Sequence, residues 1–140
     1  MAELIDTNIL VYRVDGRFPK KQAIATALLR KGIEQGSVRL AHQTIVEFVA
    51  AVTRALPGGS ILSRNDAFRE AEEFLHQFEI LYPNENILRL AMRGCAAYGM
   101  NWFDAHLWAY AEFYGLSELV TEDLEHDRLY GSVRVANPFL

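Results

Sequence analysis

The chain has 140 residues with a formal net charge of −4, and 51% of its residues are hydrophobic. This balance predicts one folded domain over residues 1–140 and argues against disorder. No apolar run approaches the ~20 residues of a membrane-spanning helix, so no membrane association is expected. An acid at Glu3, where a secretory signal carries basic residues, argues against secretion. Cys95 is the single cysteine, which excludes an internal disulfide, and a cytoplasmic protein is predicted.

The net charge hides an asymmetry along the chain. Residues 1–54 hold eight Lys and Arg against five Asp and Glu, and the remainder holds six against thirteen. The basic side chains of the first part either form a phosphate-facing surface or lie on the solvated faces of ordinary helices. Charge alone favours the second interpretation. The residues concerned are Arg13, Arg17, Lys20, Lys21, Arg30, Lys31 and Arg39.

Short apolar runs alternate with amphipathic helical segments along the whole chain. Strands separated by helices predict a mainly parallel central sheet with helices on both faces, a three-layer α/β/α sandwich. In chain order, apolar spacing and turn residues predict a strand at 4–5, helices over 8–14 and 22–34, a strand over 38–41, a helix over 45–56, a loop at 57–60, a helix over 65–78, a strand over 80–82, helices over 86–98 and 103–114, and strands at 119–120 and 133–136.

Four acids stand in unusual places. Asp6 follows the first predicted strand and Asp123 follows the strand at 119–120. Glu47 lies in a nearly all-apolar segment, and Asp104 stands among large apolar side chains. In parallel sheets, ligands bind at the carboxyl ends of the strands. These four positions are therefore the candidates for a functional site.

Each acid also has a purely structural explanation. Asp6 and Asp104 can stabilise the N-terminus of a helix, and Asp123 can belong to a solvated acidic turn. Glu47 follows Thr44 at the spacing of a capping box. Asp104 is the hardest to explain in this way, because its surroundings are apolar and no Lys or Arg lies between residues 94 and 127. A metal ion or a helix N-terminus must supply the missing positive field.

The four acids together are more informative than any one of them. Converging carboxylates repel by roughly 4 kcal/mol per pair at ~4 Å and an effective dielectric near 20. A fold therefore keeps them only with a cation or with some of them protonated. Oxygen ligands without a cluster of Cys or His favour Mg²⁺ or Mn²⁺ over structural zinc. Such ions commonly serve phosphoryl-transfer chemistry.

The acids lie in segments that resemble those of the PIN-domain family, and the end of the chain looks like that of VapC-type toxin ribonucleases. Each segment is short, but four in this order over the whole length form a specific signal. They are Leu4-Ile5-Asp6-Thr7-Asn8-Ile9-Leu10-Val11-Tyr12, Thr44-Ile45-Val46-Glu47-Phe48, Asn101-Trp102-Phe103-Asp104-Ala105, and Leu119-Val120-Thr121-Glu122-Asp123-Leu124 followed by Val135-Ala136-Asn137-Pro138-Phe139.

The resemblance implies roles for individual residues. Asp6 and Asp104 match the principal metal ligands, and Glu47 and Asp123 match acids that ligate directly or through water. Glu122 leaves a one-residue ambiguity about the fourth acid, although Asp123 fits the family pattern better. The residues that match supporting polar positions are Asn8, Thr121 and Asn101, the last of which replaces the Ser or Thr of many relatives.

The implied activity is hydrolysis of an RNA phosphodiester with Mg²⁺, or with Mn²⁺ as a substitute, which leaves 5′-phosphate and 3′-hydroxyl ends. The resemblance also implies a homodimer, a VapB-type antitoxin as partner, and tRNA or rRNA as substrate. The alternative is a non-catalytic PIN-fold module that recognises RNA or protein, and the presence of all four acids argues against it. A phosphatase of the haloacid-dehalogenase type is set aside because it needs an Asp where this chain has Asn8.

Overall fold

The computed structural model describes residues 2–140. They form six helices and six strands, which are the six helices and five strands predicted from the sequence together with the unpredicted strand β5. In chain order they are β1 (Glu3–Ile5), α1 (Thr7–Val14), α2 (Pro19–Gln35), β2 (Val38–Ala41), α3 (His42–Thr53), α4 (Arg64–Gln77), β3 (Glu79–Leu81), α5 (Glu85–Tyr98), α6 (Trp102–Phe113), β4 (Glu118–Val120), β5 (Leu129–Tyr130) and β6 (Val133–Ala136).

The six strands form one sheet in the order β3-β2-β1-β4-β6-β5. Every neighbouring pair is parallel except β5 and β6. The central strand β1 lies between β2 and β4, and Ile5 at its end is in register with Val120 at the end of β4. The carboxyl ends of three strands that are distant in sequence therefore meet at one edge of the sheet.

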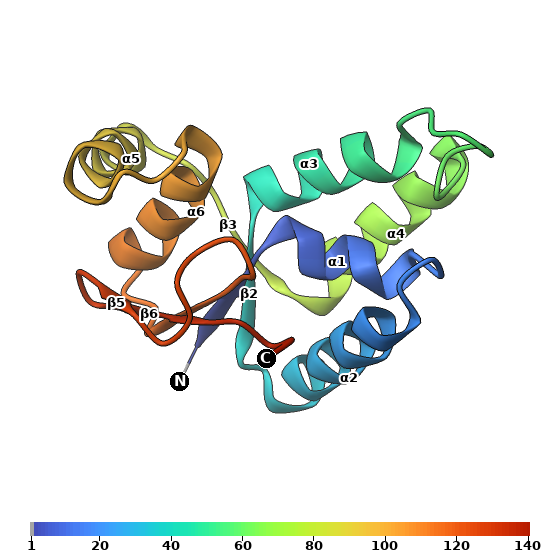
Figure 1. The fold of residues 1–140 in the computed structure, drawn as a ribbon, viewed down its shortest axis with the longest axis horizontal. Coiled ribbons are helices and arrows are strands. Elements are labelled where there is room, and N and C mark those ends of the chain that lie inside the picture. The colour runs from blue at the N-terminus through green and yellow to red at the C-terminus, as the bar shows by residue number, and fades with distance from the viewer. Residues whose placement is uncertain (1) are drawn as a thin grey trace.

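Helices cover both faces of this sheet (Figure 1), with α5 and α6 on one face and α1, α2, α3 and α4 on the other. The strands are buried on both sides because successive side chains point to opposite faces. Leu4 packs with residues of α5 and α6, whereas its neighbour Ile5 packs with residues of α1, α3 and α4. Leu119 and Val120 divide between the two cores in the same way. The predicted three-layer α/β/α sandwich is confirmed.

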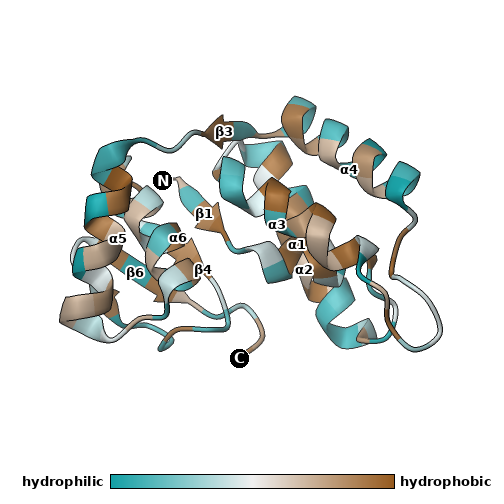
Figure 2. Ribbon diagram, turned by 90° about the horizontal axis from the view of Figure 1, so that it is seen from above, coloured by the Kyte–Doolittle hydropathy of each residue, from teal (hydrophilic) through white to brown (hydrophobic). Residues whose placement is uncertain are grey.

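The helices carry apolar and hydrophilic stretches around their circumference (Figure 2), which is the pattern of helices with one buried face. Figure 2 also shows the layer of α5 and α6 separated from the layer of α1 to α4, with β1 between them. None of the helices within residues 2–140 has the length and apolar character needed to cross a membrane.

Helix α3 begins earlier than its sequence pattern suggests. The predicted helix runs over 45–56, but α3 covers His42–Thr53 and its N-cap position is Ala41, which has no side-chain acceptor. Thr44 and Glu47 are therefore inside the helix, and the capping-box explanation of Glu47 is wrong. The strand β2 passes directly into α3 without a polar capping residue, and this continuity hides the boundary in the sequence.

Candidate metal centre

The structure brings the predicted acids to the carboxyl edge of the sheet. Asp6 follows β1 directly, and its backbone N–H donates to the carbonyl of Val120 at the end of β4. The turn after β4 carries Asp123, α3 carries Glu47 and the first turn of α6 carries Asp104. Four separate segments of the chain thus contribute to one place.

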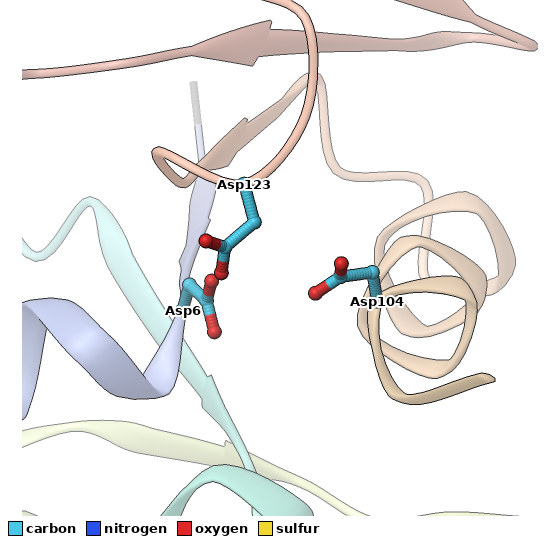
Figure 3. A group of neighbouring side chains, drawn as sticks. All are labelled: Asp6, Asp104 and Asp123. Carbon is cyan, nitrogen blue, oxygen red and sulfur yellow. The ribbon is translucent and has the colours of Figure 1, made fainter. Parts of the chain in front are cut away.

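Three of the carboxylates form a tight group. Asp6, Asp104 and Asp123 each offer one oxygen, and these oxygens lie within 4.8 Å of one another. Figure 3 shows the carboxylates of Asp6 and Asp123 side by side, with that of Asp104 facing them from α6. Asp6 is 5% exposed, Asp104 is half-buried and Asp123 is exposed. Oxygens converging from several directions suit a hard divalent cation.

Glu47 lies outside this group of three but in the same cleft. The cleft encloses about 660 Å³ and is lined by all four acids. Thr7 donates its hydroxyl to Glu47 Oε1 across 3.3 Å, and Gln43 donates its side-chain amide to the same oxygen across 3.0 Å. These two bonds fix the direction of the carboxylate. Neither Thr7 nor Gln43 stands out in the sequence as a site residue, although the position of Gln43 four residues before Glu47 on a helix predicts contact between the two side chains.

Asp6 and Asp123 are tied together by the hydroxyl of Thr121. This hydroxyl donates to Asp6 Oδ2 across 2.6 Å and accepts a hydrogen bond of 3.1 Å from the backbone N–H of Asp123. Asn8 donates its amide to Asp123 Oδ2 across 3.3 Å. Both residues therefore lie where a supporting hydrogen bond was predicted.

Asn101 begins α6 and contacts Asp104 twice. Its side-chain carbonyl accepts from the backbone N–H of Asp104 across 2.9 Å, which caps the helix. Its side-chain amide donates to Asp104 Oδ2 across 2.5 Å. The third predicted supporting residue thus both starts the helix and orients the acid.

Glu122 and Asp123 point in different directions. Lys21 donates its ammonium to Glu122 across 2.7 Å, and the hydroxyl of Tyr12 donates to the same carboxylate. The Glu122 side chain is only 18% exposed and is occupied by this pairing. Asp123 instead faces Asp6 and Asp104 (Figure 3). The geometry therefore makes Asp123, and not Glu122, the neighbour of the other acids.

The concentration of negative charge changes the acidity of the group. Burial, with smaller contributions from Asp123 and Asp104, raises the pKa of Asp6 to about 7 against the opposing hydrogen bond from Thr121. Burial also raises the pKa of Asp104, with added repulsion from Asp123 and Glu47. Both carboxyl groups are therefore harder to ionise than in water, and a cation in the cleft would favour their charged forms.

Most of the basic residues in the first part of the chain form ion pairs, in agreement with the favoured interpretation that they lie on ordinary helix faces. Four of these seven residues pair with acids within the part of the chain that the structure describes: Arg13 with Glu70, Arg17 with Asp15, Lys21 with Glu122 and Arg39 with Glu79. None of the seven lines the acid cleft, whereas Arg54 and Phe103, which the sequence analysis did not single out, both do.

The comparisons with known proteins show the family and the fold of the chain. The family model of the PIN domain matches residues 4–132. No curated protein is similar enough in sequence to match the chain.

Among solved structures, a toxin–antitoxin complex from Klebsiella pneumoniae is similar over 98% of both chains, with 19% identity and a TM-score of 0.69. A DNA-bound VapBC from Salmonella typhimurium is similar over 99% of this chain and 98% of its own, with 15% identity and a TM-score of 0.71. FitAcB from Neisseria gonorrhoeae has 23% identity and a TM-score of 0.64 over 98% of both chains. At these identities the likeness establishes a shared fold. The PIN-domain model matches most of the chain, and the acids lie together at one edge of the sheet. The chain therefore belongs to the PIN-domain family.

Proposed function

We propose that this protein is one PIN domain acting as a VapC-type toxin endoribonuclease, which hydrolyses RNA phosphodiester bonds with Mg²⁺ or Mn²⁺. The observation that carries the proposal is the convergence of the Asp6, Asp104 and Asp123 carboxylates within 4.8 Å, in a chain of the PIN family. Glu47, on the other wall of the same cleft, completes the set of four acids.

The residues of the cleft suit a divalent cation. The three aspartates form no ion pair with Lys or Arg within residues 2–140. A buried carboxylate such as Asp6 needs a compensating charge, and carboxylate oxygens are the ligands that Mg²⁺ and Mn²⁺ prefer. The bound ion would supply Lewis-acid stabilisation of the phosphoryl oxygens.

The chain's own residues then divide the remaining tasks. We assign Asp6 and Asp104 as the principal ligands, as the resemblance to PIN domains implies, and the carboxylate of Asp104 faces those of Asp6 and Asp123 (Figure 3). Both hydrogen bonds to Glu47 end on Oε1, so Oε2 is left to ligate or to orient a water molecule. Thr121 and Asn8 hold Asp6 and Asp123 in place against their mutual repulsion.

The proposed partners are a VapB-type antitoxin and a second copy of the chain. The similar structures from Klebsiella pneumoniae and Salmonella typhimurium are toxin–antitoxin complexes. Phe113 and Tyr114 at the end of α6 are 40% and 38% exposed, and their ring centroids lie 5.1 Å apart. Exposed apolar side chains that gather in this way suit contact with a partner. A tRNA or rRNA substrate would make the cytoplasm the place of action.

The test is cleavage of a total small-RNA pool by purified protein with Mg²⁺, with Mn²⁺ and with chelator. Wild type should cut only with metal, and Asp104→Asn should lose at least about a hundredfold in rate, the scale on which single electrostatic groups act in catalysis. Asp127→Asn is the matched control, because Asp127 is exposed, lies on the same turn as Asp123 and loses the same charge.

The outcomes separate the candidate functions. Metal-dependent cleavage that disappears in Asp104→Asn but not in Asp127→Asn supports the nuclease. Binding of RNA by folded protein, with no cleavage under either metal, would favour the non-catalytic binding module. Equal cleavage by wild type and Asp104→Asn would overturn the proposed site.

A further inference from the structure

The acid cleft is also lined by residues other than the four acids. They include Arg54 at the end of α3 and Phe103 at the start of α6. We propose, on the basis of the proposed function, that Arg54 and Phe103 form a subsite for a nucleotide of single-stranded RNA that flanks the cleavage position. Arg54 binds its phosphate and Phe103 stacks on its base.

The spacing of residues along α3 places Arg54 beside the site. Glu47, Ala50, Ala51 and Arg54 recur at intervals of three and four, so they share one face of the helix, and all four line the cleft. The rise of a helix separates Glu47 from Arg54 by about 10 Å. The alanines between them leave room along this wall. Arg54 therefore contacts a phosphate next to the acids and not the one that they hold.

The positive charge of Arg54 is not paired with an acid in the part of the chain that the structure describes. Arg13, Arg17 and Arg39 each pair with an acid, but within residues 2–140 Arg54 forms no ion pair and donates no side-chain hydrogen bond. It is exposed, and it is the only Lys or Arg lining the cleft among the described residues. An arginine at a helix C-terminus also interacts favourably with the helix dipole. That role does not need a position in the cleft, whereas phosphate binding does.

Phe103 supplies the second half of the subsite from the opposite layer. It is 62% exposed, which is unusual for a phenylalanine next to a buried helix face, and it precedes Asp104 directly. A nucleic-acid site without sequence preference combines a backbone cation with an aromatic ring for stacking. The base must be unstacked to reach such a ring, so the cleft selects single-stranded segments over duplexes.

The experiment measures binding of a fluorescently labelled, random-sequence single-stranded RNA by anisotropy, with Mg²⁺, in an Asp104→Asn background that is not expected to cut. Arg54→Ala should bind about tenfold more weakly. The slope of log affinity against log salt should fall by about 0.7, the value for one phosphate contact on a single strand. Arg54→Lys should recover part of the lost affinity and part of the lost salt slope. Arg93→Ala, which removes an exposed arginine on α5 outside the cleft, is the matched control and should change neither.

Phe103→Leu should weaken binding about fivefold without changing the salt slope, because stacking carries no counterion release. Phe113→Leu, an exposed phenylalanine at the other end of α6, is its control. Wild-type affinity and slope in Arg54→Ala, or wild-type affinity in Phe103→Leu, would overturn the subsite. Because this assay does not depend on cleavage, a failure of the nuclease proposal appears separately, as wild-type protein that cuts no RNA while the two variants still lose binding.

Discussion

The hydroxyl of Thr121 lies 2.6 Å from Asp6 Oδ2 and links the ends of β1 and β4, two strands whose residues here are 115 positions apart. The same oxygen accepts the backbone N–H of Asp123. One small side chain thus positions two of the three converging carboxylates, and it is buried, so water cannot replace it.

Thr121→Val keeps the shape of the side chain but removes its hydroxyl, so it is expected to weaken the positioning of Asp6 and Asp123. The substitution removes a donor to a buried carboxylate and an acceptor of a backbone N–H, which should cost about 1–3 kcal/mol in the free energy of unfolding. Urea denaturation in chelator measures this change, and a Mg²⁺ titration should show weaker binding. Thr121→Ser keeps the hydroxyl and should stay close to wild type. Equal stability of the Val and Ser variants would contradict the prediction.

Removal of the metal should lower the stability of the folded protein, because the clustered acids then repel one another without a cation between them. The pKa of Asp6 in the folded protein, about 7, lies above the ordinary 3.8, so the metal-free protein should lose stability as the pH rises toward and through 7. In chelator at pH 8, Asp6→Asn should be more stable than wild type. Mg²⁺ at about 100 times its Kd should stabilise wild type by about 2.7 kcal/mol and Asp6→Asn far less.

Thermal unfolding with chelator and with Mg²⁺ measures both effects. Asp127→Asn serves as the control and should respond to Mg²⁺ as wild type does, because its exposed side chain lies outside the group. A wild-type melting temperature that Mg²⁺ leaves unchanged would contradict this prediction.

The carboxylate of Asp15 should make a contribution to stability that depends on pH in the opposite sense to that of Asp6. Asp15 is buried at the end of α1, and hydrogen bonds from the side chain of Arg17 hold its pKa below the ordinary value. Its stabilising contribution is present above pH 4 and is lost as the pH falls through the lowered pKa. Asp15→Asn should therefore cost about 1–2 kcal/mol at pH 7 and much less at pH 3. Denaturant melts at the two pH values check this, and a pH-independent cost would count against it.

Gly94→Ala should destabilise the protein although alanine is the better helix former. In an exposed helix the change gains about 1 kcal/mol. Here an added Cβ would lie 2.9 Å from Trp108 Cε3, where α5 packs on α6. Overpacking of this kind costs about 1–3 kcal/mol. Gly16→Ala, whose Cβ would meet no atom within 4 Å, is the control. Chemical denaturation that finds Gly94→Ala more stable than wild type would contradict the predicted packing.

The sequence predicts most of the architecture because its strong patterns are local. Apolar spacing identifies the helices, and alternation with short apolar runs identifies the parallel sheet. The strand β5 escapes this reasoning, because it has two residues and one of them, Leu129, is 53% exposed. The start of α3 escapes it too, because Ala41 ends a strand and begins a helix without a polar cap. The first failure comes from the shortness and exposure of β5, and the second from the missing polar cap at the start of α3.

The candidate site is predictable in part for the same reason. Asp6 and Asp123 follow strands that the sequence identifies, so their meeting at one edge follows from the topology. Glu47 and its donors Thr7 and Gln43, in contrast, meet only because α1 and α3 pack together. The engagement of Lys21 by Glu122 also depends on packing between segments 101 residues apart. Local pattern contains no information about such pairs.

The pairing of β1 with β4 has a consequence during protein synthesis. The amino-terminal acids Asp6 and Glu47 leave the ribosome well before Asp104 and Asp123, and at 5–20 residues per second the 115 residues between Asp6 and Thr121 take roughly 6–23 s to appear. Until β4 has been made and docks beside β1, Asp123 cannot join the other acids. A cell making this protein therefore has a period of seconds per molecule in which the chain exists but the acid cluster does not.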